Sequence, residues 1–445
     1  MAGLFGTDGV RGVANRDLTP ELAFALGRAA AVALAGGGKP RVVVGRDTRA
    51  SGAMLQAALS AGICSAGGDV LRAGIVPTPA VAFLTTGLGA TAGAVISASH
   101  NPPQDNGIKF FSSGARKLPD EVEEGIEALV REGNGPRPEG GGVGRVIDER
   151  QNRELYVRHV VEAAEAPLEG MRVVVDCANG AAFRMAPDAL RRLGAEVHAL
   201  NVEPDGVNIN AGCGATHPEV VSQAVRELEA DAGVTLDGDA DRALFADAEG
   251  AVIDGDQVIA ACALAMKAQG RLPKDLVVAT VMANLGFRRA MEEAGITVLE
   301  TKVGDRYVLE EMARSGAALG GEQSGHIVFA EHATTGDGLL TAVRFLSLAR
   351  RTSRTVGELA GAMRRYPQVL ENVPVPSGTN LEEAAAVWEV VRRAEEELGG
   401  RGRVLVRPSG TEPVVRVMVE AETEEEARRH AGSVSEFIRT ALARS

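Results

Sequence analysis

One pattern of hydrophobic and polar positions occurs three times along the chain. Each copy has a run of β-branched residues, a polar turn, apolar residues at helical spacing, a glycine and a second apolar segment. The copies are RVVVGRDTRASGAMLQAALSAG from Arg41, RVVVDCANGAAFRMAPDALRRLGAEV from Arg172 and LVVATVMANLGFRRAMEEAGITVLET from Leu276. Uninterrupted valine runs suit strands buried on both faces of a parallel or mixed sheet. The pattern therefore predicts three strand–helix–strand units in three similar α/β domains.

The C-terminal part of the chain has a different pattern. GRVLVRPSGTEPVVRVMVEAETEEEARRHAGSVSEFIRTAL predicts strand, loop, strand and helix, which is typical of a smaller α+β domain. The Gly/Pro-rich stretch at 133–144 has no periodicity and predicts a flexible loop or linker. We expect α/β domains at residues 1–150, 151–254 and 255–366, and the α+β domain at 367–445.

Composition and charge narrow the function classes. A chain of 445 residues is too long for one core, and its net charge of −13 argues against general binding to nucleic acid or anionic membranes. The net charge is compatible with a small anionic substrate, because such a substrate needs only a local positive pocket. The four cysteines form no CxxC pair, and the longest apolar run is far shorter than the roughly 20 residues that span a bilayer. We expect a cytoplasmic protein.

The stretch TLDGDADRALF contains three alternating aspartates, Asp237, Asp239 and Asp241. Side chains two residues apart on an extended backbone point to the same side, so we expect the carboxylates to converge. Three like charges are unfavourable together unless a cation neutralises them, and hard oxygen ligands favour Mg²⁺ or Ca²⁺. An EF-hand is excluded because Arg242 and Ala248 stand where it needs Gly and Glu. The alternative to a metal site is a solvated acidic turn.

Three other stretches carry candidate ligand groups. LVRPSGTEPVVRV (405–417) and LFGTDGVRG (4–12) combine guanidinium groups with exposed backbone N–H groups, which suits phosphate or carboxylate. LGGEQSGHIVF (319–329) places hydrogen-bonding groups in an apolar context, which suits sugar hydroxyls. Each has a plainer interpretation as a turn between strands. The candidate residues are Arg407, Ser409, Gly410, Thr411, Arg416, Arg11, Glu322, Ser324 and His326.

The stretch GAVISASHNPPQDNGIKFF (93–111) ends an apolar run with two serines. A serine in a turn is usually a turn former, and a nucleophilic serine needs a base and a charge that positions the electrophile. His100, Lys109 and a metal at the aspartates would supply them. The residues alone do not choose between Ser97 and Ser99.

Five motifs occur in order across nearly the whole chain: FGTDGVRG, ISASHNPPQDNGIK, LDGDADR, GEQSGH and RPSGTEP. In this combination the chain resembles the α-D-phosphohexomutase superfamily. GEQSGH, with Gln323 after the glutamate, is most similar to the branch that acts on glucosamine phosphates. The resemblance implies a four-domain, heart-shaped α/β mutase with three similar mixed-sheet domains, a smaller C-terminal domain and a central active site. It also implies conversion of glucosamine 6-phosphate to glucosamine 1-phosphate on the route to UDP-N-acetylglucosamine.

The resemblance assigns roles to individual residues. It implies that Ser99 is a phosphoserine that joins the three aspartates as a metal ligand, and that Lys109 is the general base. The family's metal loop usually reads Asp-Gly-Asp-Gly-Asp-Arg, and Ala240 replaces its second glycine. A positive φ at that position would destabilise the loop by roughly 1 kcal/mol or more. The other implied site residues are Arg11, His100 and Arg242 in catalytic support, Glu322, Ser324 and His326 in the sugar loop, and Arg407, Ser409, Gly410, Thr411 and Arg416 in the phosphate loop.

Cofactors and partners follow from the same resemblance. It implies one Mg²⁺ per active site, sugar 1,6-bisphosphate as intermediate and activator, and small sugar phosphates as substrates. It leaves open a homodimer and the priming of Ser99 by a kinase or by autophosphorylation. The alternatives are a phosphomannomutase or phosphoglucomutase, a metal-dependent phosphatase that transfers phosphate to water, and a non-catalytic sugar-phosphate-binding protein.

Overall fold

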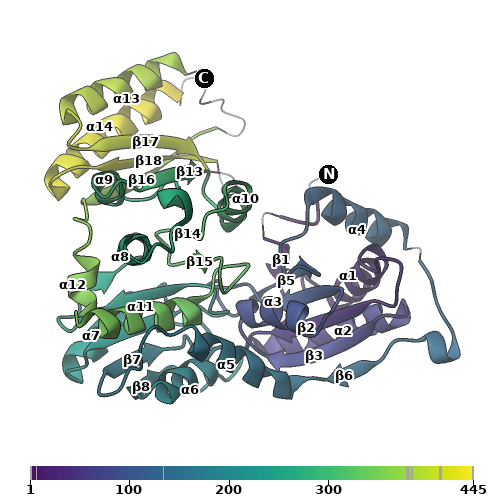
Figure 1. Cartoon of the computed structure of the whole chain (residues 1–445). Helices are drawn as coiled ribbons and strands as arrows, with labels where there is room; N and C mark the ends of the chain where they lie inside the picture. The colour runs from purple at the N-terminus through teal and green to yellow at the C-terminus, as the bar shows by residue number, and fades with distance from the viewer. Residues whose placement is uncertain are drawn as a thin grey trace. The chain divides into compact units, whose positions relative to one another are not determined.

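The computed structural model describes residues 3–6, 8–133, 135–376, 381, 384–409 and 413–442. The chain forms two compact units, which are described separately. The larger contains Met1–Met282 and Ile296–Ala362, and the smaller contains Ala283–Gly295 and Met363–Ser445. Figure 1 shows four sheets with helices packed on them. The prediction of three similar mixed-sheet domains and a smaller C-terminal sheet domain is confirmed.

The first sheet has the strand order β1-β5-β4-β2-β3-β6. Strands β2, β3, β4 and β6 run parallel, and β1 and β5 add antiparallel partners beyond β4. The central strands are buried along nearly their whole length, as their valine and alanine runs predict. The elements are β1 Val10–Val13, α1 Pro20–Ala33, β2 Arg41–Arg46, α2 Ala50–Ser65, β3 Asp69–Ile75, α3 Thr78–Gly87, β4 Ala92–Ile96, β5 Asp105–Ser112, α4 Asp120–Glu132 and β6 Val146–Asp148.

The second sheet repeats this arrangement in the order β11-β10-β9-β7-β8. Strand β7 lies between β8 and β9 and is parallel to both, and β9 is followed by its antiparallel partner β10. The elements are α5 Arg153–Glu162, β7 Arg172–Asp176, α6 Met185–Arg192, β8 Glu196–Leu200, α7 Pro218–Glu227, β9 Ala232–Leu236, β10 Ala243–Ala246 and β11 Val252–Ile253.

The third sheet has the order β13-β12-β14-β15, with β12 parallel to both of its neighbours. Helix α8 begins with a capping box in which Asp254 and Gln257 satisfy each other's backbone N–H groups. The elements are α8 Gly255–Ala268, β12 Leu276–Thr280, β13 Thr297–Thr301, α10 Asp305–Ser315, β14 Leu319–Gly321, β15 Ile327–Phe329, α11 Gly338–Thr352 and α12 Val356–Ala360.

The strand order switches sides at the same place in all three sheets. After β2, β7 and β12 the next strand lies on one side, and the strand after that lies on the other side. Open α/β sheets bind ligands outside the carboxyl ends of the strands at such a switch point. The segments that leave β4, β9 and β14 there begin with Ser97, Asp237 and Glu322. The topology therefore places the serine, aspartate and sugar-loop motifs at equivalent positions of the three domains.

The smaller unit contains an antiparallel sheet in the order β16-β18-β17. Helices α13 and α14 bury their apolar faces against this sheet. Helix α9 belongs to this unit, and its first residue, Leu285, donates its N–H to Glu420 Oε2 at 2.9 Å. The elements are α9 Leu285–Glu293, β16 Gln368–Pro374, α13 Ala385–Leu398, β17 Arg403–Pro408, β18 Val414–Glu420 and α14 Glu424–Leu442.

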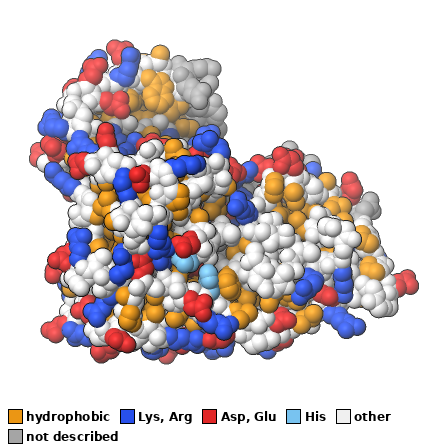
Figure 2. Space-filling view, in the orientation of Figure 1, with side chains coloured by type: hydrophobic (Ala, Val, Ile, Leu, Met, Phe, Trp, Pro, Cys, Tyr) orange, Lys and Arg blue, Asp and Glu red, His pale blue; other side chains and the backbone are white. Residues whose placement is uncertain are grey.

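No helix within the described residues has the length and apolarity needed to cross a membrane. On the face drawn in Figure 2, the acidic and basic side chains of the described residues are interspersed. Cys64, Cys177, Cys213 and Cys262 are free thiols.

Candidate active site

The two serines of the loop that follows β4, called the serine loop here, have different surroundings. Ser99 is buried, and its Oγ donates a hydrogen bond to Asp237 Oδ2 at 2.5 Å. Ser97 Oγ instead donates to Asp47 Oδ2 at 2.6 Å and accepts the Ser99 N–H at 3.0 Å. Ser99 has a φ of 51°, a left-handed conformation that non-glycine residues seldom adopt and that is often found at functional sites. Ser99 is therefore the serine that faces the aspartates, and Ser97 orients its backbone.

A fully buried arginine, Arg49, holds this loop in place. Its Nε donates to Asp47 Oδ2 at 2.8 Å, so the guanidinium is paired with a fully buried carboxylate. All of its remaining N–H groups are directed at backbone carbonyls of the serine loop, which fixes the loop through a rigid fork of donors. The accepting carbonyls are those of Ser99 (3.0 Å), Asn101 (2.8 Å), Asp105 (3.0 Å) and Pro102.

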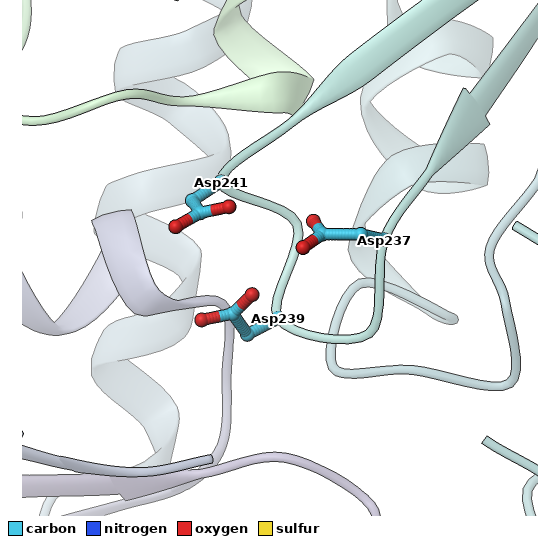
Figure 3. Close-up of side chains that lie close together, drawn as sticks. All are labelled: Asp237, Asp239 and Asp241. Carbon is cyan, nitrogen blue, oxygen red and sulfur yellow. The ribbon is translucent and has the colours of Figure 1, made fainter. Parts of the chain in front are cut away.

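The three predicted aspartates converge after β9. One carboxylate oxygen from each of Asp237, Asp239 and Asp241 lies within 4.8 Å of the others, and all three residues are buried (Figure 3). The backbone reason given above is wrong, because the loop is a tight turn rather than an extended strand. Ala240 has a φ of 56° at its centre, so the unfavourable case for this alanine applies.

The electrostatics of this cluster fit a divalent cation. Burial raises the pKa of Asp237 well above its usual value, and the neighbouring Asp241 and Asp239 raise it further. Burial and Asp239 raise the pKa of Asp241 to about 6. The Oδ1 atoms of Asp239 and Asp241 are buried without a hydrogen-bond partner. Buried, unpartnered carboxylate oxygens are the ligands that Mg²⁺ prefers, so the donor set fits a hard cation.

Residues of neighbouring segments hold the serine and metal loops close together. Thr78 donates its hydroxyl to Asp239 Oδ2 at 2.5 Å, and Asn210 donates its amide to the Ser99 carbonyl at 2.9 Å. A side chain at Gly238 would lie 2.6 Å from the same Ser99 carbonyl, so only glycine permits this approach. Close packing of the backbones thus places the hydroxyl of Ser99 at the edge of the aspartate cluster.

Two cationic side chains gather around Asp8. Asp8 forms ion pairs with both Arg11 and Lys109. Burial lowers the pKa of Lys109, but the carboxylates of Asp8, Asp305, Asp241 and Asp239 outweigh it and raise the pKa above its usual value. Lys109 is therefore an ammonium ion in this state, which suits charge neutralisation better than proton abstraction.

His100 has the opposite charge state. Burial, Arg242 and Arg11 lower the pKa of His100 to about 4, so its ring is neutral near pH 7. Its Nδ1 lies 3.3 Å from Ser99 Oγ. Burial lowers the pKa of Arg242, but Asp241, Asp237 and Glu322 raise it, and the guanidinium stays charged. The site thus offers one neutral base at the serine, and three cations that interact with the aspartates or with His100.

The sugar loop joins the metal loop through the backbone. Ala243, which follows Arg242, donates its N–H to the carbonyl of Gly325 at 3.1 Å. Ser324 Oγ and both ring nitrogens of the buried His326 have no hydrogen-bond partner, and Glu322 Oε1 accepts the Gly304 N–H at 3.0 Å. Unsatisfied buried groups in such a loop suit hydroxyls of a bound ligand.

The predicted phosphate loop lies in the smaller unit. Arg407 and Arg416 are directly opposite each other on β17 and β18, so their side chains lie on one face of the sheet. Burial and Arg416 together lower the pKa of Arg407. Two opposed guanidinium groups repel unless an anion lies between them. Ser409 follows β17, and Gly410 and Thr411 lie outside the described residues.

Comparison with known proteins is decisive for the family. Models of the phosphoglucomutase/phosphomannomutase α/β/α domains I, II and III match residues 2–136, 154–250 and 254–366, and the C-terminal domain model matches 370–436. A phosphoglucosamine mutase of Symbiobacterium thermophilum is 56% identical over 99% of this chain and 100% of its own. A phosphoglucosamine mutase of Moorella thermoacetica is 58% identical over 96% and 97%. The chain belongs to the phosphoglucosamine mutases.

A solved structure supports the fold of this phosphoglucosamine mutase family member. A phosphoglucomutase/phosphomannomutase family protein from Burkholderia thailandensis superposes with a TM-score of 0.83 at 25% identity, covering 98% of this chain and 97% of that one. The chain is therefore a mutase of the isomerase class, as the five motifs predict.

Several residues that build the site carried no recognised signal in the sequence. Asp47 and Arg49 read as an ordinary charged turn in GRDTR, and Thr78 as a helix start. Asp8 lies within the FGTDGVRG motif but was not among the candidate residues, and Asn210 lies outside the five motifs. The available signal for Asp47 and Arg49 was a pair of opposite charges immediately after a strand buried on both faces.

Proposed function

We propose that the chain converts glucosamine 6-phosphate to glucosamine 1-phosphate through a phosphoserine at Ser99 and a sugar 1,6-bisphosphate. The single observation that carries this proposal is the 2.5 Å hydrogen bond from Ser99 Oγ to Asp237 within a cluster of three buried aspartates. A hydroxyl held at these aspartates, with which Lys109 also interacts, matches the needs of phosphoryl transfer, which are positioning and charge neutralisation. The product would feed the synthesis of UDP-N-acetylglucosamine.

Asp237, Asp239 and Asp241 would hold one Mg²⁺, with a phosphoryl oxygen on Ser99 completing the set. When bound, such a cation stabilises negative charge on a transferring phosphoryl group. The three aspartates are buried, so bulk water has little access to them, and Thr78 fixes the orientation of Asp239.

In the first transfer, O1 of the sugar attacks the phosphorus and the Ser99 Oγ–P bond breaks. The O1 proton passes to a base, and the serine leaves as an alkoxide that takes up a proton. The raised pKa of Lys109 favours the neutral His100 as that base, and Lys109 then neutralises the phosphoryl oxygens. The general-base role assigned to Lys109 by family resemblance stays a prediction.

In the second transfer, the bisphosphate has turned over. Ser99 Oγ attacks the phosphorus on O6, the O6–P bond breaks, and O6 takes up a proton to give glucosamine 1-phosphate. Glu322, Ser324 and His326 would bind the sugar hydroxyls in both orientations. Arg407, Arg416 and the phosphate loop would hold whichever phosphate is not reacting, because they can bind a dianion in either orientation.

A mutase assay on glucosamine 6-phosphate with Mg²⁺ and catalytic glucosamine 1,6-bisphosphate tests the proposal. Ser99→Ala is expected to reduce the rate by about 10³-fold or more, because no covalent acceptor remains. Ser97→Ala is the matched control and is expected to keep most of the rate. Full activity of Ser99→Ala would rule the phosphoserine mechanism out. Faster turnover of glucose or mannose phosphates would reassign the substrate within the superfamily.

Localisation and assembly complete the proposal. Four free thiols are typical of a reducing compartment, which supports action in the cytoplasm. A homodimer and the agent that primes Ser99 stay predictions, which light scattering and phosphopeptide analysis of the purified protein would test.

A further inference from the structure

One cavity of the larger unit is lined by arginines. It has a volume of about 270 Å³ and lies where β2 and β3 end, next to the start of α6 and the segment that enters α5. None of its lining residues belongs to the catalytic set. It is called the arginine cavity here, and its polar lining residues are Arg46, Gln56, Arg72, Arg150, Arg153 and Arg184.

The charge of the arginine cavity is unusual for this protein. Five arginines line it in a chain with a net charge of −13, and no described lining residue is acidic. The nearby Asp148 pairs with Arg72 at 2.8 Å and with Arg150 at 2.6 Å, so it neutralises only part of this charge. Concentrated positive charge in a concave site attracts a small anion.

Two of these guanidinium groups have unused donors. The Nε atoms of Arg46 and Arg72 are buried and have no hydrogen-bond partner. A buried donor without an acceptor is unfavourable, and an anion in the cavity would supply the acceptor. Burial lowers the pKa of Arg46, although Asp47 raises it, so this arginine is only weakly compensated by the protein.

Shape and packing limit the kind of anion. The volume is just below the range of about 300 to 1,000 Å³ that holds most small ligands, so one phosphate group and part of a ring would fill it. Gly74 lets the Arg150 side chain lie against the backbone, since a Cβ there would be 3.0 Å from its Cγ. Arg184 lies 4.9 Å from the ring centroid of Phe183 at the rim. This aromatic–guanidinium pair offers a flat surface for the remainder of the ligand.

We propose that the arginine cavity binds a phosphorylated small molecule at a site separate from the catalytic one. The cavity approaches the catalytic loop at Arg46, whose Nη1 donates to the Asp47 carbonyl at 3.1 Å. Asp47 in turn holds Ser97 and Arg49 under the serine loop. A ligand in the cavity would therefore contact Arg46, which is directly bonded to Asp47, the residue that holds the serine loop through Arg49 and Ser97.

Calorimetric titration of the full-length chain tests the proposal. The background protein carries Arg407→Gln and Arg416→Gln to weaken the catalytic phosphate loop, and EDTA removes divalent metal. The three probes are inorganic phosphate, glucosamine 6-phosphate and uridine diphosphate. At least one is expected to bind with one equivalent per chain, and the tightest of them identifies free phosphate, sugar phosphate or nucleotide as the source.

Variants then locate the binding. Adding Arg150→Gln and Arg184→Gln is expected to weaken binding at least about tenfold, because two charge-assisted hydrogen-bond donors are lost. Adding Arg158→Gln, an exposed arginine of α5 outside the cavity, is expected to change it less than about twofold. Absence of binding by all three probes, or equal binding by the Arg150→Gln/Arg184→Gln variant, would overturn the proposal. The mutase assay does not enter this test, so its outcome is independent of the proposed reaction.

Discussion

The serine loop after β4 and the metal loop after β9 occupy the same position in two copies of one fold, yet their charges are balanced differently. Under the serine loop, Asp47 of the turn after β2 is buried and paired with Arg49, whose other donors satisfy carbonyls of the loop. In the metal loop, Asp239 and Asp241 keep buried oxygens without a hydrogen-bond partner. The carboxylate under the serine loop is neutralised by a protein side chain, whereas the carboxylates of the metal loop require a bound cation. A rigid support and a reactive centre can therefore have the same topology and differ only in the source of the compensating charge, which is a protein side chain in one and a bound cation in the other.

The largest effect on stability is expected from substituting Arg49, which holds the serine loop in place. Arg49→Met leaves the Asp47 carboxylate buried and unpaired, which should lower the free energy of unfolding by about 3–5 kcal/mol. Arg49→Lys keeps the charge but has too few donors for the same contacts, so we expect it to lose stability and activity as well. Denaturant unfolding and the mutase rate measure both, with Arg158→Lys as an exposed control. A wild-type rate and stability for Arg49→Lys would show that the fork of donors is unimportant.

Substitutions of Lys109 distinguish a role in charge neutralisation from a role in proton transfer. If its ammonium group neutralises the phosphoryl oxygens, Lys109→Met should lower kcat by about 10²-fold or more, and Lys109→Arg should keep a larger share. The pH profile of kcat distinguishes the roles. Equal losses for both variants, with the ionisation of a basic group removed from the profile, would instead support the general-base role.

The metal loop predicts a pH-dependent response to Mg²⁺. The folded-state pKa values of Asp237 and Asp241 are raised, the latter from 3.8 to about 6, so without metal the folded state binds more protons than the unfolded state. For Asp241 this contribution to stability is present at low pH and is lost as the pH rises from about 4 to about 6, and for Asp237 it is lost as the pH rises through its raised folded-state pKa. We therefore expect Mg²⁺ to raise Tm more at about pH 8 than at about pH 5, where protons compete for the carboxylates.

The control for this prediction is the Asp239→Asn/Asp241→Asn variant. Removing two carboxylates should abolish the Mg²⁺-induced rise in Tm and weaken its pH dependence. The side chain of Arg49 contacts no metal-binding carboxylate. The loss of stability in Arg49→Met should therefore be the same with and without EDTA. A Tm shift with Mg²⁺ that is equal at both pH values would contradict the assigned pKa directions.

The smallest effect is expected for Ala240→Gly. Glycine removes the cost of a left-handed alanine, about 1 kcal/mol, but it also increases the entropy of the unfolded chain. We therefore expect the free energy of unfolding to change by less than about 1 kcal/mol. Retention of Mg²⁺ affinity would show that the alanine is a tolerated departure, whereas a gain of several kcal/mol would show larger strain in the loop.

The sequence predicted much of the fold because strands and helices are set by local patterns. The valine runs beginning at Arg41, Arg172 and Leu276 indeed form the central strands of three similar sheets. The packing of helix α9 with the C-terminal residues was not predictable, since an amphipathic pattern does not state which surface covers it. The motifs identified the family, and their order across the chain made that identification specific.

The details of the site were less accessible, because they depend on backbone conformation and long-range contacts. Convergence of the aspartates was predicted from an extended strand, whereas a turn with a left-handed Ala240 brings them together. Ser97 and Ser99 are alike in sequence and differ only in what they contact across the fold. The complete burial of Arg49 was not predictable, because burial of a charge depends on the surrounding structure rather than on its neighbours in the chain.

Transfer of a labelled phosphoryl group tests the central claim most directly. The chain is labelled with ³²P at its primed serine, freed of small molecules, and mixed with glucosamine 6-phosphate and Mg²⁺ in a single turnover. The account predicts that label leaves a peptide containing Ser99 and appears first in sugar bisphosphate and then in glucosamine monophosphate. Label that stays on the protein, lies on another residue or is released as inorganic phosphate would contradict it.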